Sequence, residues 1–314
     1  MGAPSSKPPS ARRAWNLDEL VGALRTARAE WDHHTGHTSS EGFPSRDALV
    51  GIVRGLRAAL FPRHYGSPDL PEESVDYFVG NTLDTTLSEL LEQVRRELAY
   101  RARADGVPAK DLERRASELV RDFTLRLPDV RRLLETDVRA AYDGDPAARG
   151  VDEVLFCYPG VTAVTHYRLA HALYQLGVPL LARIIAELAH ASTGIDIHPG
   201  AQIGESFFID HGTGVVIGET AVLGARVRLY QGVTLGAKSF PLDEHGVTIK
   251  GAPRHPIIED DVVIYAGATV LGRVTIGRGS SIGGNVWLTN GVPANSRITQ
   301  ARSRADVFVD GAGI

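Results

Sequence analysis

The sequence predicts an α+β chain in which an N-terminal all-α helical domain is followed by a left-handed parallel β-helix. Two observations carry this prediction. Aliphatic residues recur in six-residue steps from Ile197 to Leu288, a period that is typical of parallel β-helices. Before them, from Trp15 to about Ala191, apolar residues fall at helical spacing and are interrupted by Pro and Gly. A chain of 314 residues is long enough for both parts.

The chain is expected to begin with a disordered tail over residues 1–14, which are rich in Pro, Ser and Ala. The helical domain is expected over 15–192, and Asn16 with Glu19 forms a plausible cap for its first helix. Pro128 and other prolines are expected at helix ends. The further segments that we expect to be helical are 46–60, 73–103, 110–125, 130–142, 161–175 and 179–191.

The β-helix is expected over 193–295, followed by a flexible tail over 296–314. Each six-residue step supplies one strand and one corner, three steps make a coil, and coils stack at about 4.8 Å. Ordinary sandwich strands would instead alternate with a period of two. The repeated positions are all Ile, Leu or Val: Ile197, Ile203, Ile209, Ile217, Leu223, Leu229, Leu235, Ile258, Ile264, Val270, Ile276, Ile282 and Leu288.

The composition excludes several classes of protein. A net charge of −4 argues against general nucleic-acid binding, because that function needs a basic surface. Cys157 is the only cysteine, so an intrachain disulfide is impossible and a cytoplasmic location is expected. No apolar run approaches the ~20 residues that span a bilayer, so no membrane partner is expected.

Two interruptions of the repeat are candidate binding loops. The first is the two-residue slip around His211, and the second is the excursion over 238–255. Counting strands around the prism places Asp196 and His211 at the same corner in adjacent coils. A carboxylate beside an imidazole favours the tautomer and basicity of a general base that acts on a hydroxyl.

The same count places His255 at a different corner from His211. One prism cannot readily bring these two imidazoles together. Two prisms packed side by side in a trimer can, so we expect a site that is shared between subunits.

The motifs between about Asp137 and Leu288 together resemble the serine O-acetyltransferase family. Six-residue repeats alone specify only a broad transferase superfamily, whereas the pairing of Asp-Ile-His-Pro with Asp-His-Gly-Thr-Gly is far more specific. The matching motifs are Asp145-Pro146-Ala147, Tyr158-Pro159-Gly160, Tyr167-Arg168-Leu169-Ala170-His171, Thr193-Gly194-Ile195-Asp196-Ile197-His198-Pro199, Asp210-His211-Gly212-Thr213-Gly214, Gly218-Glu219-Thr220-Ala221 and Arg254-His255-Pro256.

The resemblance implies acetyl transfer from acetyl-CoA to the hydroxyl of L-serine, which gives O-acetylserine for cysteine biosynthesis. His211 would take the hydroxyl proton as general base, Asp196 would orient it, and the hydroxyl would attack the thioester directly. By the same match, Asp145 and Asp210 hold the substrate ammonium. Two further matches, Arg254 and His255, bind the carboxylate and assist the serine, and an Arg suits a carboxylate through its two-pronged donor geometry.

Coenzyme A is implied to lie in the groove between adjacent prisms, against Gly236, Ala237, Lys238 and Ala266. No metal is expected. The resemblance also implies a homotrimer or a dimer of trimers. The acidic, glycine-containing C-terminus ends in Ile314 and resembles tails that insert into O-acetylserine sulfhydrylase, which is therefore an expected partner.

Three other readings stay open on the residues alone. An acetyltransferase for a sugar hydroxyl would keep the base but would have little use for charged groups arranged around a zwitterion. A non-enzymatic scaffold would leave the stacked Asp196 and His211 unexplained. A metalloenzyme of the γ-carbonic anhydrase type would need three ligands at a tight spacing that the sequence does not show; its candidate ligands are His198, His211, His245 and His255.

Overall fold

The computed structural model describes residues 15–35, 42–102, 109–240 and 243–300. The chain divides into two compact units, Met1–Gly42 and Phe43–Ile314. The first unit contains α1 (Leu17–Thr35), which has acidic residues in its first turn and histidines in its last, as the helix dipole favours. The expected tail over 1–14 lies outside the described residues.

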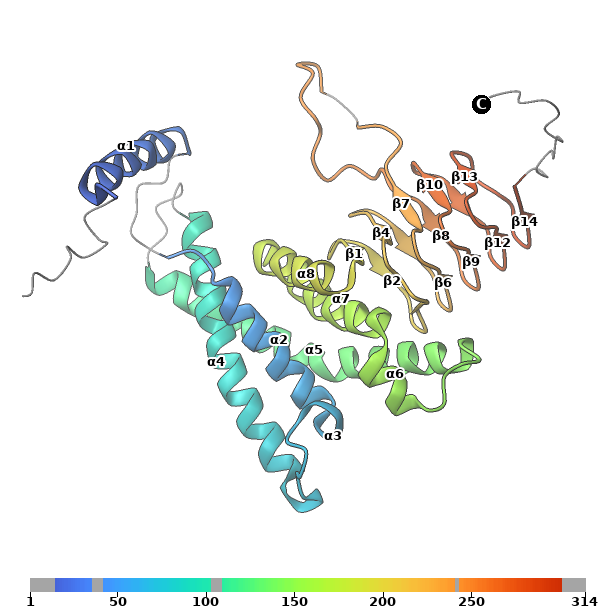
Figure 1. Cartoon of the computed structure of the whole chain (residues 1–314), viewed down its shortest axis with the longest axis horizontal. Helices are drawn as coiled ribbons and strands as arrows, with labels where there is room; N and C mark the ends of the chain where they lie inside the picture. The colour runs from blue at the N-terminus through green and yellow to red at the C-terminus, as the bar shows by residue number, and fades with distance from the viewer. Residues whose placement is uncertain (1–14, 36–41, 103–108, 241–242, 301–314) are drawn as a thin grey trace, which may run out of the picture. The chain divides into compact units, whose positions relative to one another are not determined.

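The second unit begins with helices that largely match the expected segments (Figure 1). Ser45 caps the first of them, since its hydroxyl accepts a hydrogen bond from the Ala48 N–H at 3.2 Å. The helices are α2 (Arg46–Leu60), α3 (Pro62–Tyr65), η2 (Glu72–Ser74), α4 (Val75–Ala102), α5 (Ala109–Gly144), α6 (Val151–Cys157), α7 (Pro159–Gln175) and α8 (Pro179–Thr193).

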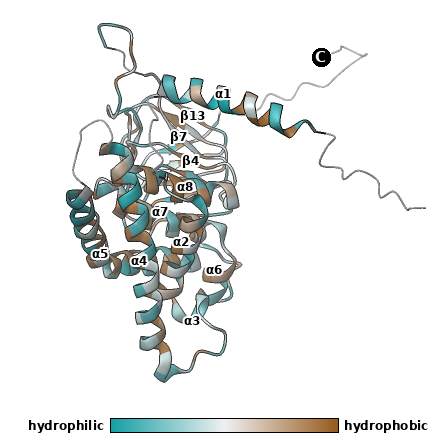
Figure 2. Ribbon diagram, turned by 90° about the vertical axis from the view of Figure 1, so that its left-hand side faces the viewer, coloured by the Kyte–Doolittle hydropathy of each residue, from teal (hydrophilic) through white to brown (hydrophobic). Residues whose placement is uncertain are grey.

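The expected break at Pro128 was wrong, because α5 continues through this proline. A proline in a helix costs about 3 kcal/mol, since it removes one backbone hydrogen bond. The buried face of α5 continues on both sides of it through Phe123, Leu127, Val130 and Leu134, which are at most 5% exposed. Each such side chain contributes about 1.5–3 kcal/mol on burial, which outweighs the lost bond. Figure 2 shows apolar and polar residues alternating along the helices.

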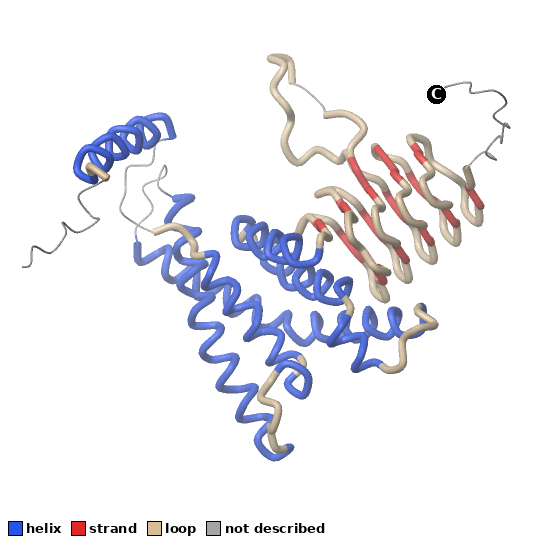
Figure 3. The backbone as a smooth tube through the Cα atoms, in the orientation of Figure 1, coloured by secondary structure: helices blue, strands red, loops and turns tan. Residues whose placement is uncertain are grey.

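The second half of this unit is a parallel β-helix built from three sheets, of the type that six-residue repeats form (Figure 3). Sheet A has the order β1-β4-β7-β10-β13, sheet B β11-β8-β5-β2, and sheet C β14-β12-β9-β6-β3. Every repeated aliphatic position lies on the predicted face; in sheet A, for example, Ile197 pairs with Ile217, and Ile217 with Leu235.

The strands are short, and outside β13 and β14 the second residue of each is buried. They are β1 (Asp196–Ile197), β2 (Gln202–Ile203), β3 (Phe208–Ile209), β4 (Val216–Ile217), β5 (Val222–Leu223), β6 (Arg228–Leu229), β7 (Thr234–Gly236), β8 (Ile257–Ile258), β9 (Val263–Ile264), β10 (Thr269–Leu271), β11 (Thr275–Ile276), β12 (Ser281–Ile282), β13 (Trp287–Leu288) and β14 (Arg297–Ile298).

The last strand, β14, lies inside the stretch that was expected to be a flexible tail. It pairs with β12, so that Ile298 stacks on Ile282. The six-residue step fails here, because Ile298 follows Leu288 by ten positions, so the prediction placed the end of the β-helix too early. Residues 301–314, including Ile314, lie outside the described residues.

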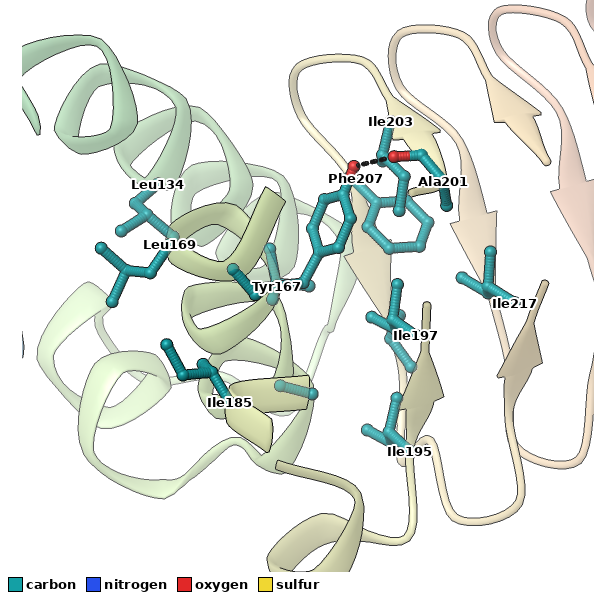
Figure 4. Close-up of a cluster of buried hydrophobic side chains, with 14 of the residues drawn as sticks. Leu134, Tyr167, Leu169, Ile185, Ile195, Ile197, Ala201, Ile203, Phe207 and Ile217 are labelled. Atoms are coloured by element: carbon teal, nitrogen blue, oxygen red, sulfur yellow. Dashed lines mark hydrogen bonds between the residues drawn. The ribbon is translucent and has the colours of Figure 1, made fainter. Parts of the chain in front are cut away.

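Helices α7 and α8 pack against the first coil and close that end of the β-helix core. Figure 4 shows Tyr167 of α7 lying against Phe207 of the first coil, whereas Leu169 of α7 lies beside Leu134 of α5 on the side away from the coil. The Tyr167 hydroxyl reaches across this contact and donates a hydrogen bond to the Ala201 carbonyl at 2.7 Å. Gly194 ends α8 with a positive φ of 70°, a conformation that favours glycine.

None of the described helices is both long enough and apolar enough to cross a membrane. Between β7 and β8 the chain leaves the coil, forms the predicted excursion, and returns at Arg254 and His255 (Figure 3).

Candidate active site

The corner between sheets C and A carries the two-residue slip. This corner stacks on the one below it, since the Gly214 N–H donates to the Gly194 carbonyl at 2.8 Å. Gly212 has a φ of +91°, and a Cβ there would lie 2.4 Å from Ile195 Cδ1. Only glycine satisfies both constraints, so the backbone holds Asp210 and His211 in a defined turn.

Asp145 and Asp210 lie near this corner, and we call the group of Asp145, Tyr158, Asp210, His211 and Arg228 the acidic edge. Asp210 forms an ion pair with Arg228 at 2.8 Å. Asp145 accepts hydrogen bonds from the Tyr158 hydroxyl and from the Ala147 N–H. These two bonds, with smaller attractions from Arg228 and His211, lower the pKa of the Asp145 carboxyl, so that it stays ionised at neutral pH.

His211 projects from the turn with its side chain 75% exposed, and its Nε2 lies 4.0 Å from an oxygen of Asp210. Asp196 begins the strand in the coil below, as predicted. A carboxylate oxygen of Asp196, a carboxylate oxygen of Glu187 and a ring nitrogen of His190 all lie within 4.8 Å of one another. Over the described ranges no hydrogen bond joins Asp196 to His211, so the orienting role of Asp196 stays a prediction.

The corner between sheets A and B holds the other predicted groups, and we call Thr220, Glu219, Arg254 and His255 the basic edge. His255 is only 6% exposed and lies over Gly218, where a Cβ would be 2.0 Å from the ring. Its Nδ1 accepts the Thr220 N–H at 3.1 Å, which leaves the proton of the neutral ring on Nε2. Burial, helped by Arg254, lowers the His255 pKa to about 4, so the ring is neutral near pH 7.

Arg254 is held by Glu219 through an ion pair of 2.7 Å. Glu219 also accepts a hydrogen bond from the Tyr174 hydroxyl at 3.2 Å. Tyr174 in turn contacts His198 edge to face, and burial lowers the His198 pKa to about 4. The guanidinium expected to bind a substrate carboxylate is therefore kept in place by a resident carboxylate.

The acidic and basic edges lie on two different corners of the same prism. His211 follows a strand of sheet C, whereas His255 stacks on the chain that leaves sheet A at Gly218. The structure thus brings together Asp145, Asp210 and His211, and separately Arg254 and His255. It does not bring the two sets together within one chain.

The residues expected to contact coenzyme A divide between both ends of sheet A. Gly236 ends β7, and its carbonyl accepts the Gly272 N–H at 2.9 Å. Lys238 follows it and is exposed beside Gly272, whereas Ala237 is half-buried. Ala266 lies at the opposite corner, where its carbonyl accepts the Asn285 N–H at 2.8 Å.

A zinc site of the γ-carbonic anhydrase type finds no support among the described residues. There, the group of possible ligands that lies close together is Glu187, His190 and Asp196, with one histidine. His198 and His255 each have a ring nitrogen occupied by a backbone N–H.

Sequence reasoning missed the partners of the predicted residues. Tyr158 was part of a quoted motif but was given no role. Its place directly before Pro159, at the start of a helix, could have indicated that its side chain is held in a fixed position. Arg228 and Glu219 hold Asp210 and Arg254, respectively. Arg228 begins β6 at an outward-facing position, where the repeat specifies no residue type, whereas Glu219 lies in a quoted motif but was given no role.

The family model for the bacterial transferase hexapeptide (six repeats) matches residues 255–290. A protein of Synechococcus elongatus with the name "Serine acetyltransferase, plasmid" is 60% identical over 316 residues, which cover 99% of both chains. A serine acetyltransferase of Mycobacterium tuberculosis is 52% identical over 160 residues, 51% of this chain and 66% of that protein.

Two solved structures are also similar. Serine acetyltransferase isoform 3 of Entamoeba histolytica, in complex with cysteine, has a TM-score of 0.69 and 33% identity, and the match covers 83% of this chain and 85% of that one. Serine acetyltransferase 1 of the same organism, in complex with L-cysteine, has a TM-score of 0.68 and 39% identity over 80% of this chain and 86% of that one. With 60% identity to a relative along nearly its whole length, and with this fold, the chain belongs to the serine acetyltransferase family.

Proposed function

We propose that this protein transfers the acetyl group of acetyl-CoA to the hydroxyl of L-serine, giving O-acetylserine and CoA. The observation that carries the proposal is the pair of edges, one with two carboxylates and the other with a guanidinium, each with one histidine. A zwitterionic amino acid needs an anionic group for its ammonium and a cationic group for its carboxylate. Asp145 and Asp210 supply the first, and Arg254 supplies the second.

In the proposed reaction His211 removes the serine hydroxyl proton while the oxygen attacks the thioester carbonyl. A C–O bond forms and the C–S bond breaks, and the leaving thiolate takes the proton from His211 to give CoA, which restores the neutral imidazole. The exposure of His211 allows a substrate to reach its ring. Asp196 would orient His211 once the carboxylate turns from Glu187 toward the corner above. The neutral His255, whose Nε2 carries a proton, would donate a hydrogen bond to the substrate.

The site is proposed to form between two copies of the chain, the acidic edge of one facing the basic edge of the next. A cyclic trimer creates three equivalent sites in this way. Acetyl-CoA would lie in the groove between the copies, against Gly236, Ala237, Lys238 and Ala266, and no step uses a metal. A dimer of trimers, a cytoplasmic location and a complex with the sulfhydrylase through Ile314 stay predictions.

Measuring CoA release from acetyl-CoA tests the reaction. The wild-type protein should release CoA with L-serine and not with a sugar acceptor such as galactose. His211→Ala should abolish the release, whereas His64→Ala, which changes a histidine of the helical part, should leave it intact. Release with the sugar alone, or full activity of the His211→Ala protein, would overturn the proposal.

A further inference from the structure

We infer that Tyr158 is the positioning residue that fixes Asp145, and that Asp145 rather than Asp210 supplies the net charge that holds the substrate ammonium. This inference rests on the proposed function and assigns unequal roles to the two carboxylates of the acidic edge.

Both oxygens of Asp145 are fixed by hydrogen bonds. Asp145 follows the end of α5, and its Oδ1 accepts the Ala147 N–H at 2.8 Å. Its Oδ2 accepts the Tyr158 hydroxyl. A carboxylate offers about four lone-pair sites, so two bonds leave an acceptor on each oxygen for an ammonium. The carboxylate is therefore oriented and still has capacity to bind.

The partners of the two carboxylates differ in charge. Asp210 pairs with the Arg228 guanidinium at 2.8 Å, which compensates its charge. That guanidinium is itself held between the rings of Phe208 and Tyr230, at 4.8 and 4.7 Å from their centroids, and donates to a backbone carbonyl. Asp145 has a neutral phenol as its side-chain partner, so its negative charge is less compensated.

Tyr158 is placed by the packing of the helix that it precedes. It is the N-cap of α7, and Pro159 occupies the first helical position. Gly160 then lies against the Ile209 carbonyl, next to Asp210, in a contact too close for any side chain. The Asp145 carboxylate raises the Tyr158 pKa to about 12, so the phenol keeps its proton near neutral pH and donates a hydrogen bond to this carboxylate.

Tyr158→Phe tests the inference because it removes only the hydroxyl. A hydrogen bond to a charged group accounts for roughly a tenfold change in binding, so KM for L-serine should rise about tenfold. The kcat and the KM for acetyl-CoA should stay within about twofold of wild type, as expected when binding is lost equally in the ground state and the transition state. The preference for L-serine over 3-hydroxypropanoate, which lacks the ammonium, should narrow by the same factor.

Tyr167→Phe is the matched control, because it removes a buried phenol that bonds the Ala201 carbonyl. It should lower the melting temperature and leave KM for L-serine unchanged. Asp145→Asn is the second test variant, because it removes the charge and leaves one amide oxygen, which can replace only one of the two accepting carboxylate oxygens. It should raise KM for L-serine at least as much as Tyr158→Phe.

An unchanged KM in a folded Tyr158→Phe or Asp145→Asn protein would overturn the inference. So would a rise in KM for acetyl-CoA equal to the rise for L-serine. If the wild-type protein releases no CoA with L-serine, the proposed function fails instead, and the two failures are distinguishable.

Discussion

Arg168 donates to both carboxylate oxygens of Asp137, each at 3.0 Å, and both side chains are only 3% exposed. The same guanidinium donates to the carbonyls of Ile203 and Gly204, at 2.5 and 2.6 Å. Asp137 also accepts the Phe207 N–H at 2.8 Å. The pair thus joins α5 and α7 to the corner between β2 and β3, one strand before the acidic edge.

Arg168→Met should lower the free energy of unfolding by about 3–5 kcal/mol, because it leaves a buried carboxylate without its partner. Urea denaturation measures the change. The control is Arg226→Met, which breaks the exposed ion pair with Asp261 and should have little effect. Equal losses in the two variants would contradict the role assigned to the buried pair.

Gly160→Ala should disturb the acidic edge through packing alone. A Cβ at this position would lie 2.3 Å from the Ile209 carbonyl oxygen, so α7 must move away from β3. Overpacking of this kind costs about 1–3 kcal/mol. We expect lower stability together with a lower kcat/KM for L-serine. Gly80→Ala is the matched control, since a Cβ there meets nothing within 4 Å, and it should slightly stabilise α4.

Stability should fall as the pH drops from about 6.5 toward 4, because burial lowers the pKa of His198 and His255 to about 4. Above pH 6.5 both rings are neutral in the folded and unfolded states, so they impose no cost. Below it the unfolded chain binds protons that the folded protein does not, which favours unfolding. Thermal melting between pH 7.5 and 4.5 measures the loss, and His198→Gln should make it shallower. The same slope in both proteins would contradict these assignments.

The aliphatic period predicted the β-helix well because one buried side chain in each step determines the fold. All the repeated positions from Ile197 to Leu288 lie on the faces assigned to them. The sequence prediction failed at two places, one where burial of apolar side chains outweighed the effect of a proline and one where the six-residue spacing itself changed. Pro128 remains inside α5 because of the apolar contacts on both sides, and Ile298 follows a ten-residue step that the period does not contain.

The site was predictable only to the level of the backbone. The register separated His211 from His255, and the structure places them on different corners. Register does not determine side-chain torsions, and the Asp196 carboxylate turns toward Glu187 and His190. The contact between Tyr158 and Asp145 arises from the packing of helices, which no periodicity encodes.

Mixing two inactive variants tests most directly whether the site is shared between chains. His211→Ala removes the base from the acidic edge, and His255→Ala removes the imidazole from the basic edge. When the two chains are co-expressed, a site regains both histidines wherever an intact acidic edge faces an intact basic edge. Random assembly into cyclic trimers makes about a quarter of the sites complete, so serine-dependent CoA release should return to about that fraction. Activity no higher than that of either variant alone would contradict a site formed between two copies.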